Sequence, residues 1–421
     1  MRISIALGLC LLAIGLSACG GGGNGDGGAS EAKTLQPSDA QGASGSVAWC
    51  IGKDTSGAFK TAVDQFNQQN PSLEAKLIEL PESADIQREQ QIQRLRAESS
   101  ECDVLGMDVV WTAEYAASGW LYDLTPVVEA HEGEFIPSTV ETVEYEGKKW
   151  ALPFNTNAGF LFYRTDEVPQ PPATWEDVYE EAGQKNGLVY QGERYEGLTV
   201  DFLELLYSAG GKVLSEDGET VEIDSPETRE ALEFLAEGID DGAVTKAVTT
   251  YEEESSRRAF EAGNATFMRN WPYAYALGKE SNIADDFAVV KFPGFGGNEG
   301  AGVVGGYNLG VSAYTDNPDG SLAFAEFMVT PEVQKQMFIK ATLPATATSV
   351  YNDAEVKAEI PFTTELLKAV EQAQARPISP VYTEISQAIY DNVFEVLNGK
   401  QSPDQAASKM SAEIEDALAR F

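Results

Sequence analysis

Strand-like and helix-like spacing of apolar residues alternates along residues 46–119, which read SVAWCIGKDTSGAFKTAVDQFNQQNPSLEAKLIELPESADIQREQQIQRLRAESSECDVLGMDVVWTAEYAASG. Three segments are rich in apolar, β-prone residues and predict strands: 46–51, 73–80 and 103–110. The segments between and after them predict helices: 57–70, 84–99 and 112–119. Strands alternating with helices at this spacing are typical of a parallel sheet, so the fold class is α/β.

The same two patterns continue to the end of the chain. An apolar stretch over 150–163 is interrupted by Asn155-Thr156-Asn157, and 302–312 predicts a further strand. Thr174, with Asp177 three residues on, predicts the N-cap of a helix. The predicted helices are 174–183, 199–209, 226–240, 252–262, 321–328, 331–340, 355–371, 383–398 and 402–418. So long a chain exceeds one typical core and predicts two lobes.

The N-terminal segment has the pattern of a targeting signal. Arg2 precedes an apolar stretch that is too short for a stable membrane span, and Leu16-Ser17-Ala18-Cys19 follows. This tetrapeptide matches the lipobox of bacterial lipoproteins, which implies a signal peptide over 1–18 and a lipid on Cys19 at the extracytoplasmic face of the cell membrane. An ordinary signal peptide with an incidental cysteine is the alternative. Residues 19–45 are rich in Gly, Ser and Ala and predict a flexible tether.

Charge and cysteine content narrow the classes of partner. The formal net charge is -38, which argues against nucleic acid or anionic lipid as a binding partner.

The four cysteines have different expected roles. Cys10 lies in the signal and Cys19 is the predicted anchor, so Cys50 and Cys102 are left. An even pair outside the cytoplasm favours one disulfide, and two separate thiols are the alternative.

The inventory of reactive side chains favours a protein that is not an enzyme. His131 is the single histidine, so nucleophilic triads and clustered zinc ligands are not expected. No phosphate-binding loop motif occurs, and we expect neither cofactor nor metal. The 67 acidic residues leave paired-carboxylate glycoside hydrolysis open, so an exported glycoside-active enzyme is the main enzymatic alternative.

Polar and aromatic side chains of the kinds found in sugar sites stand at the ends of predicted elements or directly after a glycine pair: Asp108, Asn155, Asn157 and Trp271 at element ends, and Tyr307 after Gly305-Gly306. Ligands of open α/β sheets bind beyond the carboxyl ends of strands. Sugars present hydroxyl groups that donate and accept hydrogen bonds, together with weakly apolar faces that pack on aromatic rings. The residue types at these ends therefore predict a sugar-binding site.

Five segments, in order, resemble the family 1 extracellular solute-binding proteins, the maltodextrin-binding-like group, and within it the trehalose/maltose-binding lipoproteins of ABC transporters. These segments are 102–114, 152–157, 259–263 leading to 270–272, 304–308, and 376–377 leading to 380–382. The resemblance implies a two-lobe periplasmic-binding-protein fold of type 2, with a hinge and an interlobe cleft. The implied lobes are 46–154 plus 308–344 and 155–307 plus 345–421.

The resemblance also implies a function and a ligand set. The chain would be a monomeric sugar receptor that delivers a disaccharide, trehalose first and maltose next, to an ABC permease. Another α-glucoside or a longer oligosaccharide is the alternative. The substrate-binding residues implied by the matching motifs are Arg88, Asp108, Asn157, Glu253, Trp271, Gly305, Gly306, Tyr307 and Arg376. Glu252 and Glu254 compete with Glu253 for its role, and residues 52–57 lack a Glu that some members carry there.

Overall fold

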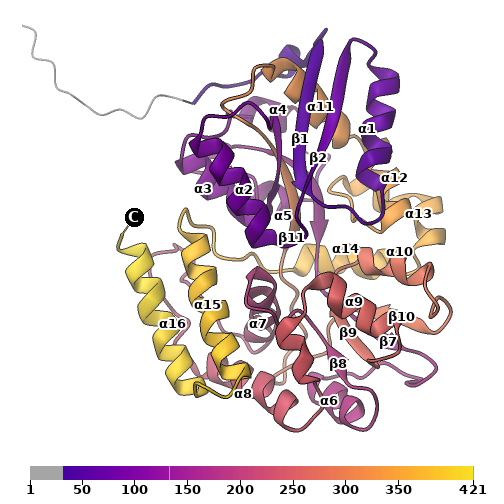
Figure 1. The fold of residues 1–421 in the computed structure, drawn as a ribbon, viewed down its shortest axis with the longest axis vertical. Helices are drawn as coiled ribbons and strands as arrows, with labels where there is room; N and C mark the ends of the chain where they lie inside the picture. The colour runs from indigo at the N-terminus through magenta and orange to yellow at the C-terminus, as the bar shows by residue number, and fades with distance from the viewer. Residues whose placement is uncertain (1–31, 132, 421) are drawn as a thin grey trace, which may run out of the picture. The chain divides into compact units, whose positions relative to one another are not determined.

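The structure, a computed structural model, describes residues 32–131 and 133–420, and that part of the chain forms two lobes, each built around its own sheet (Figure 1). The first lobe contains a five-stranded sheet in the order β2-β1-β3-β11-β6. Its strands are β1 (Gly45–Gly52), β2 (Leu73–Leu80), β3 (Val104–Asp108), β6 (Leu152–Asn157) and β11 (Gly305–Val311). β1 is parallel to β2 and β3, whereas β11 is antiparallel to β3 and β6. The α/β class and the three N-terminal strands expected from the sequence are confirmed.

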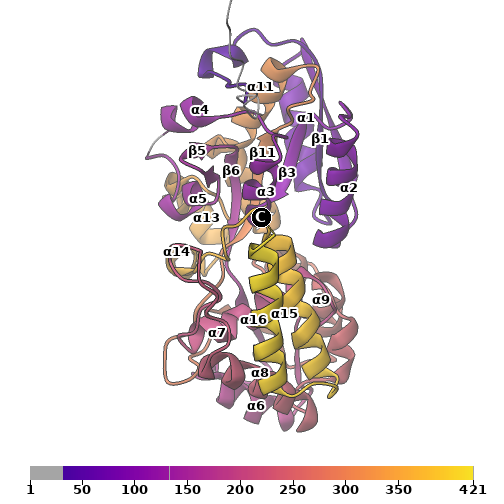
Figure 2. The same ribbon diagram turned by 90° about the vertical axis from the view of Figure 1, so that its left-hand side faces the viewer.

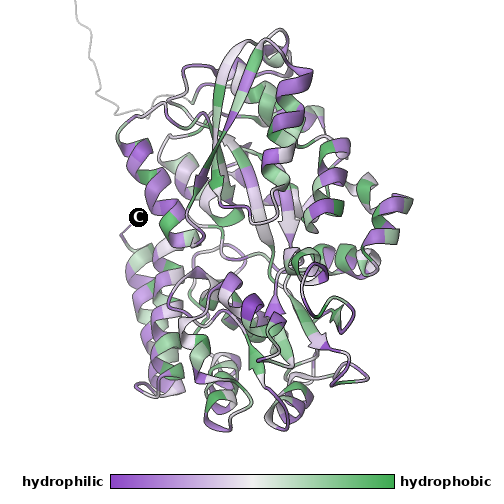
Figure 3. Cartoon of the chain, turned by 45° about the vertical axis from the view of Figure 1, so that its right-hand side comes forward, coloured by the Kyte–Doolittle hydropathy of each residue, from purple (hydrophilic) through white to green (hydrophobic). Residues whose placement is uncertain are grey.

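Helices cover the first sheet, and those over residues 58–69 and 318–328 bury aromatic side chains against it. Trp49 in β1 is fully buried, and its ring lies 5.0 Å from that of Phe59 and 5.6 Å from that of Phe324. In Figure 3 the strands show green, white and purple segments, and many helices are green on one side and purple on the other. The helices of this lobe are α1 (Ala58–Gln69), α2 (Ala84–Arg96), α3 (Thr112–Ala117), α4 (Thr125–Ala130), α5 (Pro137–Glu141), α11 (Pro318–Met328) and α12 (Pro331–Ala341), with 3-10 turns η1 (Pro37–Ala40) and η2 (Val109–Trp111).

The second lobe has a four-stranded sheet in the order β10-β7-β9-β8. Its strands are β7 (Phe160–Arg164), β8 (Leu188–Val189), β9 (Phe267–Asn270) and β10 (Phe287–Val290). The helices of this lobe are α6 (Trp175–Gly183), α7 (Glu196–Ser208), α8 (Pro226–Asp240), α9 (Glu253–Glu261), α10 (Tyr273–Lys279), α14 (Thr363–Gln372), α15 (Tyr382–Leu397) and α16 (Pro403–Leu418), with the 3-10 turn η3 (Lys246–Thr250). The helix α13 (Ala354–Glu359) and the 3-10 turn η4 (Thr348–Asn352) contact α12 and α14. α15 and α16 lie side by side along one side of this lobe (Figure 2).

The predicted lobe boundaries at 154/155 and 307/308 fall inside strands of the first sheet. β6 continues to Asn157 and β11 already begins at Gly305, and these two residues pair with each other. The polar Asn155-Thr156-Asn157 stretch looked like an interruption, but its backbone extends the ladder with β11. The chain therefore passes between the lobes directly after β6 and directly before β11.

Residues 32–45 are not part of a flexible tether, so the predicted tether over 19–45 is wrong at its C-terminal end. Leu35 is only 4% exposed, and its amide donates a hydrogen bond of 3.0 Å to the carbonyl of Asp123. One buried leucine and this backbone bond dock the segment onto the first lobe. The signal peptide and Cys19 lie outside the described residues.

Local signals for helix ends were reliable where a side chain supplies the cap. The hydroxyl of Thr174 accepts a hydrogen bond from the amide of Asp177, so α6 begins where the sequence indicates. The single helix expected over 355–371 is instead two helices, because Pro361 follows the end of α13 and cannot continue it. Within the described residues we find no helix with the length and apolar character needed to cross a membrane.

A disulfide joins Cys50 in β1 to Cys102, with Cα atoms 5.6 Å apart. The two cysteines meet because the backbone just before β3 lies beside β1, where the amide of Asp103 donates to the carbonyl of Ala48. We expect unfolded, unreduced protein to show no free thiol from this pair in a thiol-labelling assay. Two labelled thiols per chain would contradict the bond, and reduced protein is the control that must give both.

Candidate functional site

A cavity of about 200 Å³ lies between the two sheets and is lined by residues of both lobes. The first lobe supplies Gly52, Lys53, Asp54, Thr55, Ser56, Phe59, Glu82, Ala84, Gln87, Asp108, Asn155, Asn157, Gly305, Gly306, Tyr307, Ala341 and Leu343. The second lobe supplies Tyr195, Glu196, Gly197, Val200, Glu252, Glu253, Glu254, Trp271 and Tyr273, and Arg376 completes the lining. This is the interlobe cleft expected from the sequence.

The structure gathers eight of the nine substrate-binding candidates in this one cavity. They are Asp108, Asn157, Glu253, Trp271, Gly305, Gly306, Tyr307 and Arg376. They come together because β3 and β6 end at the cleft, β11 begins there, and β9 of the second sheet ends there.

Arg88 is the exception, because it does not line the cavity, and its contact with a ligand stays a prediction. Its guanidinium donates to both oxygens of the Glu114 carboxylate, from Nε at 2.8 Å and from Nη2 at 2.5 Å. Glu114 lies on α3, so the Arg88 side chain ties α2 to α3 and does not line the cavity. Nε and Nη2 form one donor edge of the guanidinium, and the Glu114 carboxylate occupies that edge.

Arg376 connects acidic residues from the two lobes. Its Nη2 donates to Asp108 Oδ1 at 2.7 Å, and its Nη1 donates to Glu196 Oε1 at 2.6 Å. Asp108 also accepts from the amide of Val110 at 3.2 Å, so the carboxylate both caps η2 and faces the cavity. The Nε of Arg376 is buried without a hydrogen-bond partner. The guanidinium of Arg376 and the amide of Val110 together hold the Asp108 carboxylate in place.

Glu196 is the most strongly perturbed acid of this group. Burial raises its pKa to about 7, and the charge of Asp108 adds to this effect, while Arg376 and hydrogen bonds from Ser386 and Tyr382 oppose it. A carboxyl group whose folded-state pKa is raised takes up its proton more readily when folded. Its stabilising contribution is therefore fully present below pH 4.5, the ordinary value, and is lost as the pH rises through about 7.

We expect Glu196→Gln to remove this dependence. The free energy of unfolding of the wild type, measured relative to Glu196→Gln, should fall between pH 4.5 and about 7 and then level off. Urea titrations at a series of pH values measure this difference, and other buried acids cancel because both proteins carry them. A difference that stays constant across the window would contradict the assignment.

Trp271 directly follows β9 and lies beside the glycine pair of β11. A Cβ added to Gly305 would come within 2.9 Å of the Trp271 ring, so glycine lets the backbone pass close to the indole. Gly306 has a φ of 120°, and an added Cβ there would lie 2.2 Å from the carbonyl oxygen of Asn155. Only glycine fits the second position, and the first shapes the wall beside the ring.

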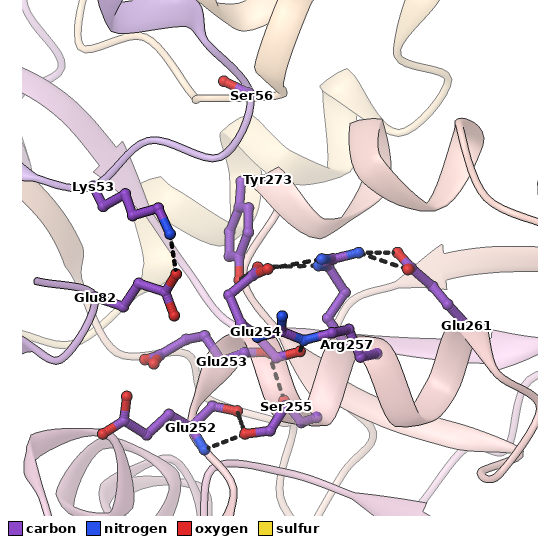
Figure 4. Close-up of polar contacts among 12 residues, drawn as sticks. Lys53, Ser56, Glu82, Glu252, Glu253, Glu254, Ser255, Arg257, Glu261 and Tyr273 are labelled. Carbon is purple, nitrogen blue, oxygen red and sulfur yellow. Dashed lines mark hydrogen bonds and ion pairs between the residues drawn. The ribbon is translucent and has the colours of Figure 1, made fainter.

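Three consecutive acids, Glu252 to Glu254, open α9 at one side of the cavity (Figure 4). Glu254 pairs with Arg257 at 2.7 Å and accepts from the Tyr273 hydroxyl. Burial alone would raise the pKa of Glu254. The hydrogen bonds and the positive charge of Arg257 outweigh burial, so the pKa of Glu254 is lowered. Glu253 accepts from the Tyr195 hydroxyl at 2.7 Å, and burial raises its pKa. Glu254 is thus paired with an arginine, and the assignment of Glu253 rather than Glu252 to the ligand stays a prediction.

Sequence reasoning missed several residues of the lining. Those never proposed include Ser56, Glu82, Gln87, Tyr195, Glu196 and Tyr273. Gln87 is buried and accepts a hydrogen bond from the Tyr307 hydroxyl at 3.2 Å. Tyr273 stands two residues after Trp271, and that spacing was an available signal. Glu196 gave none, because α7 begins three residues before the expected start.

The arrangement suits hydrogen bonding and stacking. Carboxylates and amides offer acceptors and donors, and the rings of Trp271, Tyr273 and Tyr307 offer flat apolar surface. Within residues 32–131 and 133–420, no cluster of three or more His, Cys, Asp or Glu side chains is placed to hold a metal ion.

Comparisons with known proteins agree with this geometry. The model of the family "Bacterial extracellular solute-binding protein" matches residues 52–335. A "Probable ABC transporter-binding protein" of Deinococcus radiodurans is 33% identical over 361 residues, covering 80% of this chain and 85% of the relative. A "Maltotriose-binding protein" of Pyrococcus abyssi is 26% identical over 308 residues, and the match covers 70% of this chain and 65% of that relative.

A solved structure gives the same result. The structure described as maltose-bound MalE3 of T. maritima is 35% identical, with a TM-score of 0.84, and the match covers 88% of this chain and 99% of that one. The resemblance to the extracellular solute-binding proteins and the two-lobe type 2 fold are therefore confirmed. The chain belongs to the bacterial extracellular solute-binding protein family.

Proposed function

We propose that this protein is the lipid-anchored substrate-binding protein of an ABC sugar importer and that it binds an α-linked glucose disaccharide in the interlobe cavity. The observation that carries the proposal is the pairing, in one cavity, of Trp271 from the second lobe with Asp108 from the first. A ring for stacking and a carboxylate for hydroxyl groups are the two features that a sugar site needs.

Closure of the lobes around the sugar would bring the Trp271 ring and the Asp108 carboxylate into contact with it at the same time. Trp271 would stack on one glucose ring, while Asp108 and Glu253 would accept hydrogen bonds from hydroxyl groups. Asn157 is a further candidate, since its Oδ1 is buried without a hydrogen-bond partner at the edge of the same cavity. A ligand held by both lobes favours the closed form by its additional contacts there, which would present a loaded receptor to the permease.

The choice of sugar rests on two grounds. The motif resemblance favours trehalose, and two of the similar proteins, one 35% and one 26% identical, are named for maltose and maltotriose. Trehalose and maltose share glucose rings and an α linkage, so both suit one aromatic platform.

Titration calorimetry with trehalose, maltose, maltotriose and the β-linked cellobiose tests the proposal. We expect one trehalose or maltose per chain and weaker binding of cellobiose, and no heat with any of the four would contradict it.

The same samples distinguish a receptor from a glycoside-active enzyme. A receptor returns its sugar unchanged after prolonged incubation, whereas a hydrolase releases glucose in an amount that grows with time. Release of glucose from trehalose or maltose by purified protein would contradict the receptor assignment.

The lipid anchor makes a separate prediction. Cys19 follows the lipobox, so we expect mass spectrometry of the mature protein to find Cys19 as its N-terminal residue, carrying a lipid. Cys19→Ala should leave uncleaved precursor or release the protein from the membrane. An unmodified mature Cys19 in the wild type would rule out the anchor.

A further inference from the structure

A buried arginine lies against the Trp271 ring. The guanidinium carbon of Arg269 is 4.2 Å from the centroid of the indole. Residues two apart along an extended chain point to the same side, which places the two side chains together at the end of β9. Arg269 is 3% exposed and does not line the cavity, whereas Trp271 does. The guanidinium therefore covers the part of the ring that faces away from the cavity.

Arg269 is itself fixed by partners on neighbouring elements. Its Nε lies 2.8 Å from Glu204 Oε2 and 2.9 Å from Asp201 Oδ1, and its Nη1 donates to Gln191 Oε1 at 2.7 Å. Gln191 is held in turn by a hydrogen bond from its Nε2 to the hydroxyl of Ser256. These partners set the plane of the guanidinium, and a planar cation presents a flat face to the ring.

We propose that Arg269 is a positioning residue for ligand binding: it holds the Trp271 ring in the orientation that stacks on a sugar. This inference rests on the proposed sugar site. The cation is attracted to the indole face and restricts rotation of the side chain, while the backbone of Gly305 lies close to one edge of the ring. A preoriented platform loses less conformational entropy when the ligand arrives, so the arginine strengthens binding without touching the sugar.

A merely structural role for Arg269 makes a different prediction. Asp201 and Glu204 are buried acids, and burial raises the pKa of both, so the arginine also serves to balance their charge. If balancing charge is its whole contribution, any effect on affinity will persist when Trp271 is absent. If Arg269 acts through the ring, the effect will vanish with the ring.

A double-mutant cycle separates the two roles. Arg269→Lys keeps the charge but loses the flat face and the forked donors. With trehalose and maltose as probes, Arg269→Lys should weaken binding about tenfold in the wild-type background. In the Trp271→Ala background it should change affinity by less than about twofold, since the two residues act as one unit. Equal losses in both backgrounds would overturn the proposal.

The matched control is Arg164→Lys. Arg164 is also a buried arginine on the same sheet, paired with Asp166, and it lies outside the cavity lining. The Arg164→Lys variant should bind both sugars within about twofold of the wild-type affinity.

If Arg269→Lys fails to fold, Glu204→Gln replaces it, because this change weakens one fixing contact of Arg269 while keeping the side-chain size. A loss that again depends on Trp271 supports the proposal, and one that does not overturns it.

A measurement on ligand-free protein keeps this inference distinct from the proposed function. With 5-fluorotryptophan incorporated, the Trp271 fluorine resonance is assigned by its absence in Trp271→Phe. Arg269→Lys should shift or broaden this resonance and leave those of the other tryptophans in place, whereas Arg164→Lys should leave it unchanged. An unchanged Trp271 resonance in Arg269→Lys would overturn the positioning role. Failure of both sugars to bind wild type would instead overturn the proposed function.

Discussion

Trp271→Ala is expected to weaken trehalose or maltose binding at least thirtyfold, about 2 kcal/mol or more by the usual conversion. The ring lines the cavity from the second lobe, with Arg269 behind it and Gly305 along its edge. Truncation removes the largest flat apolar surface in the cavity, and with it the contact on which a glucose ring would stack. Calorimetric titration of the purified variant measures the loss directly.

Two companion variants make this result specific. Trp271→Phe retains a smaller flat ring and should lose less affinity than the alanine variant. Trp120→Phe alters a tryptophan that packs in the first lobe outside the cavity lining, so it should leave affinity unchanged. A folded Trp271→Ala protein that binds within threefold of the wild type would remove this residue from the site.

Asp108→Ala should cost a comparable amount of binding free energy and also destabilise the protein. Each hydrogen bond from a sugar hydroxyl to this carboxylate contributes about 1.5–3 kcal/mol. The change also leaves Arg376, which is 4% exposed, without one of its two acidic partners. Removing one member of a buried ion pair costs about 3–5 kcal/mol of stability. Affinity must therefore be measured well below the unfolding temperature of the variant.

Asp103→Asn is the matched control for Asp108. Asp103 precedes the same strand at its other end, and its carboxylate accepts from the amide of Ala48 at 2.7 Å and lies outside the cavity lining. This change should lower stability and leave affinity unchanged. Asp108→Ala with normal affinity, or a loss of affinity in Asp103→Asn as large as in Asp108→Ala, would show that Asp108 does not act through the ligand.

Much of the fold was predictable because local signals and tertiary structure agree. The alternating apolar pattern over residues 73–80 predicted the bounds of β2, and its end residues Leu73 and Leu80 are both buried. Thr174 capped its helix because a hydroxyl can satisfy a free amide without any help from the rest of the fold. Strand-end placement, together with family motifs, also led to eight of the residues that line the candidate cavity.

The features that the sequence did not reveal share a physical cause: each depends on contacts between segments far apart in sequence. Arg88 lies on a polar helix, and only the docking of α3 shows that Glu114 takes up its guanidinium. Glu196 enters the cavity because α7 starts early and turns its first residue toward Arg376. Leu35 packs on the first lobe although its neighbours in sequence have the composition of a tether. No periodicity in a single segment encodes such partners.

The most direct test of the sugar site is a crystal structure of the protein grown with trehalose or maltose. The proposed site predicts one disaccharide in the cavity between the two sheets, with a glucose ring stacked on Trp271 and a sugar hydroxyl within hydrogen-bond distance of the Asp108 carboxylate. A well-ordered sugar bound elsewhere, or a closed cleft in which the sugar touches neither Trp271 nor Asp108, would contradict it.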